Sequence, residues 1–167
     1  DSNTGESHEF SNAECRFAYR MSYFKKHPEL IITDVHVHLN SVEPKEALHG
    51  IEETIREREK RHIQNVRAAG SFFMNPVAPE HVRDMFEAEK KITSREGRVP
   101  AGWLIEKAGM KGARVGGAEA SMQHPNYIVN ANNATAADVR ALASQILDAV
   151  KKQFGIDLKE EAVVWGE

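Results

Sequence analysis

Residues 69–76, Ala-Gly-Ser-Phe-Phe-Met-Asn-Pro, bring together side chains that could act on a ligand. Gly70 lets the backbone turn, and the hydroxyl of Ser71 follows it directly. Asn75 comes before Pro76, whose ring favours an extended backbone at the preceding residue. The segment could therefore hold a hydroxyl and a carboxamide in fixed directions toward a ligand, although an ordinary turn has the same composition.

Other candidate groups carry weaker signals. Glu161, close to an apolar run near the end of the sequence, could be a buried acid, although exposed carboxylates are commoner. His36 and His38 could share a strand face and hold a metal for a hydrolase, but no third ligand lies near them, so we predict no metal site. Cys15 has no local signature of a catalytic nucleophile.

Glycines and basic residues suggest two further places for an anion. Residues 112–118 contain three glycines but match neither the P-loop nor the dinucleotide fingerprint, so a phosphate cradle and simple turns both stay open. The basic residues between 56 and 61 alternate with glutamates, which is typical of a solvated helix face. Only the far end of that face, at Lys60 and Arg61, could reach a ligand.

These groups need elements to position them. Residues 30–39 alternate between apolar and polar side chains, which predicts a strand with one buried face. The spacing of Ala47, Leu48, Ile51 and Ile55 predicts an amphipathic helix over 43–61, opened by a proline, and marks the boundary between two modules.

The second half alternates helices and short strands. We expect helices over 79–92, with Val82, Met85 and Phe86 inward, and over 101–108. A longer helix over 136–154 has the capping-box pair Thr135 and Asp138 at its start. Short strands are expected at 127–130 and 162–165. Without a regular βαβ repeat, the pattern predicts an α+β fold with helices on a small mixed sheet.

Composition narrows the class of protein. The 167 residues carry a formal net charge of -3 and 41% hydrophobic residues, which is typical of a globular chain and gives no general attraction to nucleic acid. No apolar run reaches the roughly 18 to 20 residues needed to cross a bilayer, and a single cysteine fits a reducing compartment. We expect a cytoplasmic protein without membrane or nucleic-acid partners.

Several collinear motifs resemble the UDP-N-acetylenolpyruvoylglucosamine reductase family, also called UDP-N-acetylmuramate dehydrogenase. They include Cys-Arg-Phe-Ala-Tyr-Arg-Met-Ser at 15–22, the 69–76 segment, and Pro-Ala-Gly-Trp-Leu-Ile-Glu-Lys-Ala-Gly at 100–109. Further motifs lie at 116–121, 124–130, 133–136 and 154–158. The resemblance implies an oxidoreductase of peptidoglycan synthesis that uses FAD and NADPH to reduce UDP-N-acetylglucosamine enolpyruvate.

The resemblance also implies residue roles. Ser71 matches the family's proton-donating serine, Arg20 its carboxylate-polarising arginine and Glu161 its catalytic acid. The positions that match the family's substrate-binding residues are Lys60, Arg61, Asn75 and His124. Two departures from the family pattern are Met74, where a lysine is usual, and Val163, where an arginine is usual.

The resemblance finally implies how the chain is divided. In the family the FAD site lies mainly in an N-terminal half, and this sequence opens on an Asn-Thr-Gly turn without a methionine. We therefore expect residues 1–42 to be the last strands of an FAD-binding α+β domain and 43–167 to be the substrate-binding domain. The alternative is a catalytically incomplete fragment that binds the UDP-sugar and lacks most of the FAD site. Oligomeric state is left open.

Overall fold

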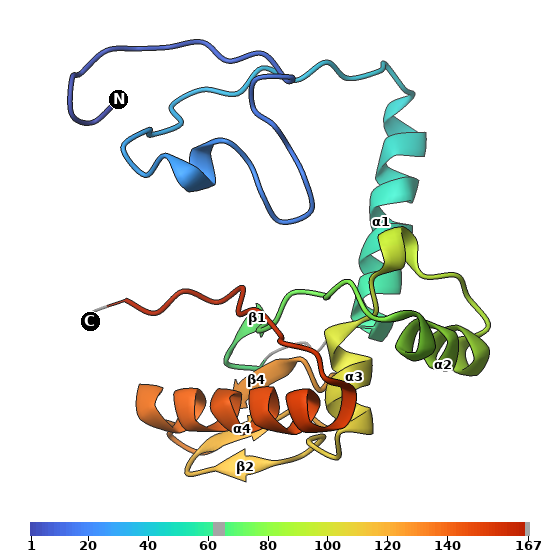
Figure 1. Cartoon of the computed structure of the whole chain (residues 1–167). Helices are drawn as coiled ribbons and strands as arrows, with labels where there is room; N and C mark the ends of the chain where they lie inside the picture. The colour runs from blue at the N-terminus through green and yellow to red at the C-terminus, as the bar shows by residue number, and fades with distance from the viewer. Residues whose placement is uncertain (62–65, 166–167) are drawn as a thin grey trace. The chain divides into compact units, whose positions relative to one another are not determined.

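The structure is a computed structural model that describes residues 1–61 and 66–165, and of Lys60 and Arg61 it describes only the backbone. The chain divides into two compact units, Asp1–His49 and Gly50–Glu167. Because their relative placement is not determined, each unit is described by itself. Figure 1 shows the elements along the chain.

The second unit is built on a four-stranded sheet with the order β1-β4-β3-β2. Its strands are β1 (Ala68–Ser71), β2 (Arg114–Val115), β3 (Ala118–Ala120) and β4 (Tyr127–Asn130). We expected a mixed sheet, but all three pairings are antiparallel. Short connections from β2 to β3 and from β3 to β4 account for two of these pairings, because neighbouring strands joined by short turns run in opposite directions.

Helix α4 (Ala136–Phe154) covers the sheet, against β2 and β3 (Figure 1). Its bounds agree with the prediction from the sequence. The side chain of Thr135 accepts a hydrogen bond from the Asp138 amide, and the Asp138 carboxylate accepts one from the Thr135 amide, which completes the expected capping box. Gly155 ends the helix in the left-handed conformation at φ 68°.

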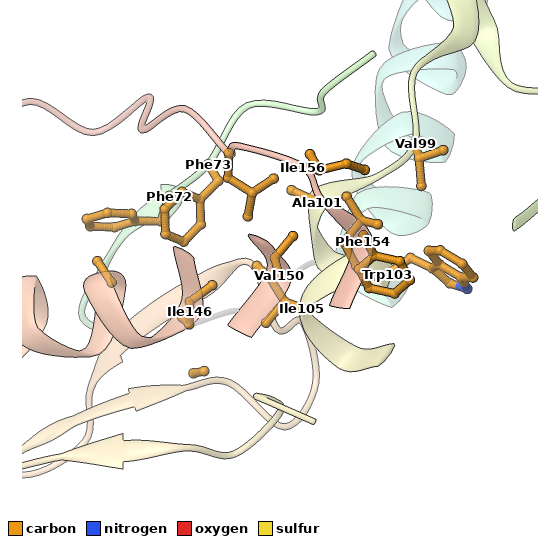
Figure 2. Packing of buried hydrophobic residues seen from close by; sticks show 14 of the residues in the cluster. Phe72, Phe73, Val99, Ala101, Trp103, Ile105, Ile146, Val150, Phe154 and Ile156 are labelled. Carbon is orange, nitrogen blue, oxygen red and sulfur yellow. The ribbon is translucent and has the colours of Figure 1, made fainter. Parts of the chain in front are cut away.

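The core lies between α4, the sheet and helix α3 (Ala101–Lys107). Leu142, Ile146 and Val150 of α4 are fully buried, as the helical stripe predicted. Trp103 packs with Phe154 at a ring-centroid distance of 6.0 Å and with Phe86 at 5.5 Å. Figure 2 shows this aromatic end of the core beside the aliphatic side chains of α4.

The remaining helices differ in how they are buried. Helix α2 (Glu80–Lys90) buries Val82 and Phe86, but Met85 is 52% exposed, so its expected inward position was wrong. Helix α1 (Pro44–Arg61) forms where the spacing predicted it, and its apolar residues Leu48, Ile51 and Ile55 are exposed. A short 3-10 turn, η2 (Arg95–Gly97), leads into α3.

The first unit contains little regular structure among its residues. Phe10, Tyr23 and Phe24, with centroids 5.2 to 6.1 Å apart, gather around the 3-10 turn η1 (Phe24–Lys26). The strand expected at 30–39 is not present, and Val35 and Val37 are exposed. The last strands of a flavin domain are likewise not formed in the described part of 1–42. Alternation favours a strand, but a strand needs a hydrogen-bonded neighbour, and none pairs with this segment.

The strand expected at 162–165 is also wrong. Val163, Val164 and Trp165 are exposed and unpaired in the ladder of strands that the described residues form. The pairing falls earlier, where Glu160 forms an isolated antiparallel bridge with Phe73.

Among the helices of the described residues, none is both long and apolar enough to cross a bilayer.

Candidate active site

A cavity of about 640 Å³ opens in the second unit where the loop after β1, the end of α2, α3 and the turn before β4 meet. The end of β1 and the loop after it contribute Ser71 and Asn75, α3 contributes Gly102 and Trp103, and the turn before β4 contributes His124. Three of the residues expected at the site therefore line one cavity, although His124 lies about 50 residues beyond Ser71 and Asn75 in the sequence. A concave site with a few convergent polar groups is the usual form of a small-molecule site.

Ser71 is half-buried at the last position of β1, opposite Tyr127 of β4. The register of this pairing shifts between Ala68 and Ser71, and Gly70 within the shift has φ 84°. A bulge of this kind changes the direction of the side chains that follow it. The expected freedom of Gly70 is thus used to set the direction of the Ser71 side chain.

The residues after Ser71 run as a central strand between two neighbours. On one side the Phe72 amide donates to the Asn126 carbonyl at 2.7 Å. On the other side the Met74 amide donates to the Lys159 carbonyl, and the Glu161 amide donates to the Phe72 carbonyl, both at 2.8 Å. Glu161 is half-buried. Its amide hydrogen bond links it to Phe72, the residue directly after Ser71.

Asn75 connects the loop to the start of α3. Its side-chain oxygen accepts a hydrogen bond from the Ala101 amide at 2.9 Å, and its carbonyl accepts one from Arg98 Nη1 at 3.0 Å. The first amides of a helix have no partner within the helix, so this carboxamide caps α3 from a distant loop. Asn75 thus has an architectural role as well as a place in the cavity lining.

His124 stands at the turn that leads into β4. Its amide donates to Ser121 Oγ at 3.3 Å, and its ring lies edge-on to the ring of Tyr127 with centroids 4.7 Å apart. Trp103, which also lines the cavity, is only 5% exposed. The cavity therefore combines an imidazole and an indole with the hydroxyl of Ser71, which suits a ligand having both flat and polar parts.

Lys90 of α2 and Glu106 of α3 line the cavity, and each is paired with an oppositely charged side chain. Lys107 Nζ lies 2.6 Å from Glu89 Oε2, and Lys90 Nζ lies 3.0 Å from Glu89 Oε1. The hydrogen bonds from Lys107 and Lys90 lower the pKa of Glu89 to about 2. Lys111 bonds Glu106 at 2.9 Å and lowers the pKa of that carboxyl also. These carboxylates stay charged at neutral pH, so they are not proton donors there.

The structure does not place the side chains of Arg20, Lys60 and Arg61 relative to this cavity. Arg20 belongs to the first unit, so its position relative to Ser71 is not determined. It lies in a tight turn between Ala18 and Met21, in the left-handed region at φ 54°, and Lys25 Nζ donates to its carbonyl. The side chains of Lys60 and Arg61 lie outside the described residues.

The glycines at 112–118 form turns. Gly116 at φ 52° and Gly117 join β2 to β3, and a Cβ at Gly117 would lie 2.1 Å from the Asn132 carbonyl oxygen. Close backbone approach explains this pair. The other open alternative, a metal shared by His36 and His38, depended on a strand that does not form, and the described residues contain no cluster of three or more metal-ligating side chains.

Reasoning from the sequence missed Asn126, which is 3% exposed and lines the cavity. Its Oδ1 accepts from the Phe73 amide at 2.9 Å, and its Nδ2 donates to the Phe73 carbonyl at 2.8 Å. Both partners lie 53 residues away, so no local pattern reveals them. The available signal was an amide side chain directly before an apolar strand.

The residues described fit one part of a flavin-dependent reduction better than another. Ser71 is half-buried, and the Glu161 amide bonds the carbonyl of the next residue, Phe72. A dinucleotide diphosphate needs clustered backbone amides, usually at glycines. In the described part of the first unit Gly5, in the opening turn, is the only glycine, so these residues do not supply such a cradle.

Comparison with known proteins identifies the family. Residues 61–165, more than half of the chain, match the model for the C-terminal domain of UDP-N-acetylenolpyruvoylglucosamine reductase. The chain belongs to this family. Its second unit, with helices packed on a four-stranded antiparallel sheet, has the α+β fold of that C-terminal domain.

Relatives of the reductase family match nearly the whole chain. The UDP-N-acetylenolpyruvoylglucosamine reductase of Moorella thermoacetica is 37% identical over 98% of this chain and 47% of its own length. That of Solibacter usitatus is 33% identical over 91% of this chain and 49% of its own length. The solved reductase of Thermus caldophilus aligns with a TM-score of 0.68 at 31% identity, over 95% of this chain and 48% of that one.

The chain thus spans about half the length of the reductases that it matches. Its assignment to their C-terminal portion follows from the matching domain model.

Proposed function

We propose that this chain is the substrate-side portion of a UDP-N-acetylenolpyruvoylglucosamine reductase, an oxidoreductase of peptidoglycan synthesis. The observation that carries the proposal is the cavity where Ser71, Asn75 and His124 converge beside the Glu161 backbone. The proposed substrate is UDP-N-acetylglucosamine enolpyruvate and the product UDP-N-acetylmuramate. FAD and NADPH are the proposed co-reactants, and the proposed compartment is the cytoplasm.

The proposed reaction adds a hydride and a proton across the enolpyruvyl double bond. When bound and reduced by NADPH, FAD would supply the hydride for the β-carbon. Ser71 Oγ donates its proton to the α-carbon, and a proton from solvent later restores the hydroxyl. A serine hydroxyl is a poor acid in water, so its position in a half-buried site between strand and cavity matters.

Charge develops on the substrate carboxylate before the proton arrives. A fixed cation lowers the barrier of such a step because it stabilises the enol form more than the starting ether. We assign this role to Arg20, whose turn is held by Ala18, Met21 and Lys25. Glu161 is the proposed acid on the opposite side, and Asn75, His124, Lys60 and Arg61 are the proposed substrate contacts.

The proposed division of the chain follows the same reasoning. Residues 1–42 are the C-terminal remnant of the FAD-binding domain, and residues 43–167 are the substrate-binding domain. The concentration of the core in the second unit supports this division, as do the exposed apolar side chains of the first.

The half-reactions test the role of Ser71. In the enzyme that carries this chain at the full length of its relatives, Ser71→Ala should leave flavin reduction by NADPH nearly unchanged. Reoxidation by the enolpyruvyl substrate should fall by about 100-fold or more, the usual range for loss of a positioned acid. Stopped-flow absorbance of the flavin separates the two rates. Equal slowing of both half-reactions would contradict the proton-donor role.

A second candidate function is that the chain binds the UDP-sugar without turning it over. The described first unit supports this alternative, because its one glycine, Gly5, does not supply a cradle for a dinucleotide diphosphate. Purified chain mixed with FAD, NADPH and substrate separates the two. Bound-flavin absorbance with substrate-dependent NADPH oxidation would rule out the binding-only alternative, whereas substrate binding without oxidation would support it.

A further inference from the structure

Asn126 occupies an unusual place beside the loop that carries Ser71. The main chain of β4 begins at Tyr127, so the neighbouring position along the loop has no strand backbone to face Phe73. The Asn126 side chain fills that position, because its oxygen and nitrogen bond the amide and the carbonyl of Phe73. A carboxamide has one acceptor and two donors, so it can imitate a peptide group of a partner strand.

The two hydrogen bonds lie in the driest part of the loop. Phe73 is 1% exposed and Asn126 is 3% exposed. A buried peptide group left without a partner is costly, so the loop cannot adopt this path unless the carboxamide stays in place. The Phe72 amide adds a third hydrogen bond, to the Asn126 carbonyl.

Asn126 also controls the opposite side of the loop indirectly. Phe72 and Met74 bond the segment Lys159 to Glu161, and Phe73 faces Glu160 in an antiparallel bridge. The Asn126 side chain therefore holds the segment Phe72–Met74 in place. Ser71 directly precedes this segment, and Glu161 lies on the neighbouring segment that pairs with it. The loop that the carboxamide bonds thus lies between Asn126 and the segment that carries Glu161.

We infer that Asn126 is a positioning residue for proton delivery, holding Ser71 and Glu161 in register through its paired hydrogen bonds to Phe73. This inference rests on the proposed function. Misplacement of a reacting group by about 1 Å can slow a reaction by about 100-fold. Loss of the paired bonds should therefore affect the step that uses Ser71 more than it affects substrate affinity.

Amide exchange on the 167-residue chain tests the geometry without any cofactor. Asn126→Ala removes both bonds, whereas Asn126→Asp keeps the acceptor for the Phe73 amide and removes the donor. By hydrogen exchange, the Phe73 amide should exchange about 10- to 100-fold faster in Asn126→Ala, the factor expected for a lost buried hydrogen bond, and less so in Asn126→Asp. Unchanged protection in both variants would overturn the inference.

Half-reactions in the full-length enzyme then test the role. Flavin reduction by NADPH should be unchanged in Asn126→Asp, while reoxidation at saturating substrate should slow by about 100-fold, with substrate affinity changed by only a few-fold. The solvent isotope effect on reoxidation should rise, since proton delivery limits the rate more strongly. A loss confined to substrate affinity would overturn the inference, because Asn126 would then only shape the cavity.

Ile128→Ala is the matched control. Ile128 lies two residues further along the same segment, is 5% exposed and packs into the core. Its truncation destabilises the strand without touching Phe73. If it reproduced the selective loss in reoxidation, general destabilisation would explain the effect and the inference would fail. If instead Ser71→Ala left reoxidation intact, the proposed function would fail at its donor, whatever the Asn126 variants showed.

Discussion

Gly102 leaves open the space between α3 and the turn that carries His124. A Cβ built on Gly102 would lie 3.7 Å from His124 Cε1 and 3.7 Å from Asn126 Cβ, which is ordinary contact. The protein therefore tolerates a methyl group there, whereas a ligand in the cavity has to share the space. A methyl group added at Gly102 is therefore expected to change ligand affinity while leaving the fold unchanged.

We expect Gly102→Ala to fold with unchanged or higher stability, since alanine in a helix is favoured over glycine by up to about 1 kcal/mol. Affinity for the UDP-sugar should fall by about tenfold or more, corresponding to roughly 1–3 kcal/mol of overpacking against the ligand. Thermal unfolding and titration calorimetry on the 167-residue chain give the two quantities.

Gly50→Ala is the control for that pair of measurements. Gly50 lies within α1, and its added Cβ would meet nothing within 4 Å. It should gain helix stability with no change in affinity. Unchanged affinity in Gly102→Ala would mean that the ligand does not occupy this part of the cavity.

At the scale of elements, α4 shows what local sequence can specify. Its start is fixed by Thr135 and Asp138, its end by Gly155, and its buried stripe by a 3.6-residue period, all within one segment. Asp138 does more than cap the helix, because its Oδ2 also accepts from the Gly117 amide in the turn between β2 and β3 at 3.4 Å. One carboxylate thus ties the helix to the sheet that it covers.

The pH dependence of the free energy of unfolding should reveal the contribution of the Asp138 carboxylate. Hydrogen bonds from the Thr135 and Gly117 amides lower the pKa of Asp138 below its ordinary value. The stability they contribute is fully present above the unfolded-state pKa, about 4, and is lost as the pH falls through the lower folded value. Asp138→Asn should therefore be less stable than the wild type at pH 7, and the difference should shrink below about pH 4.

Urea unfolding at pH 7 and near pH 2 measures this difference. Asp148→Asn makes the same exchange at an exposed position in the same helix. It should leave the pH dependence unchanged. A constant difference between Asp138→Asn and the wild type across this range would show that charge at the cap contributes nothing.

Other elements could not be predicted locally. The alternation at 30–39 describes a strand's side chains but says nothing about the neighbour that a strand requires, and in the described chain none pairs with it. The strand predicted at 162–165 was wrong for a related reason, because the backbone pairing in this region ends one or two residues before that range. Met85 was misjudged because a three-residue inward stripe is wider than the face that α2 buries.

The candidate site divides in the same way. Residue types and resemblance to the family selected Ser71, Asn75 and His124, and the structure brings these three to one cavity. Their roles, like those of Arg20 and Glu161, stay predictions. Asn126 was missed because its role consists of two hydrogen bonds across 53 residues, and such contacts leave no local trace in a sequence.

At the scale of the whole molecule, the core is concentrated in one unit. Every member of the buried apolar cluster lies between Phe72 and Leu158, while Ile31, Val35 and Leu39 of the first unit are exposed. Several large exposed apolar side chains within one short segment are typical of a surface that another part of a protein covers. This agrees with the proposal that the first unit belongs to the flavin-binding part of the longer relatives.

The C-terminal segment up to Glu161 should be required for the protection of Phe72–Met74 from hydrogen exchange. The residues after Val163 should not be required. A chain that ends at Leu158 lacks the carbonyl that the Met74 amide bonds and the amide that bonds the Phe72 carbonyl. Hydrogen exchange at Phe72–Met74 should then be about 10- to 100-fold faster. A chain that ends at Val163 keeps both bonds and serves as the control. Equal exchange in the two chains would contradict the central-strand arrangement.

The pairing of Phe72–Met74 with 159–161 also determines when the site can form during synthesis. Ser71 leaves the ribosome early, but the second neighbour of its loop is made about 90 residues later, after the whole of α4. Until then one side of the loop has no partner, and contacts so far apart in sequence form slowly. The loop that follows Ser71 is therefore expected to be among the last parts of the second unit to become ordered, whatever the order in which its helices fold.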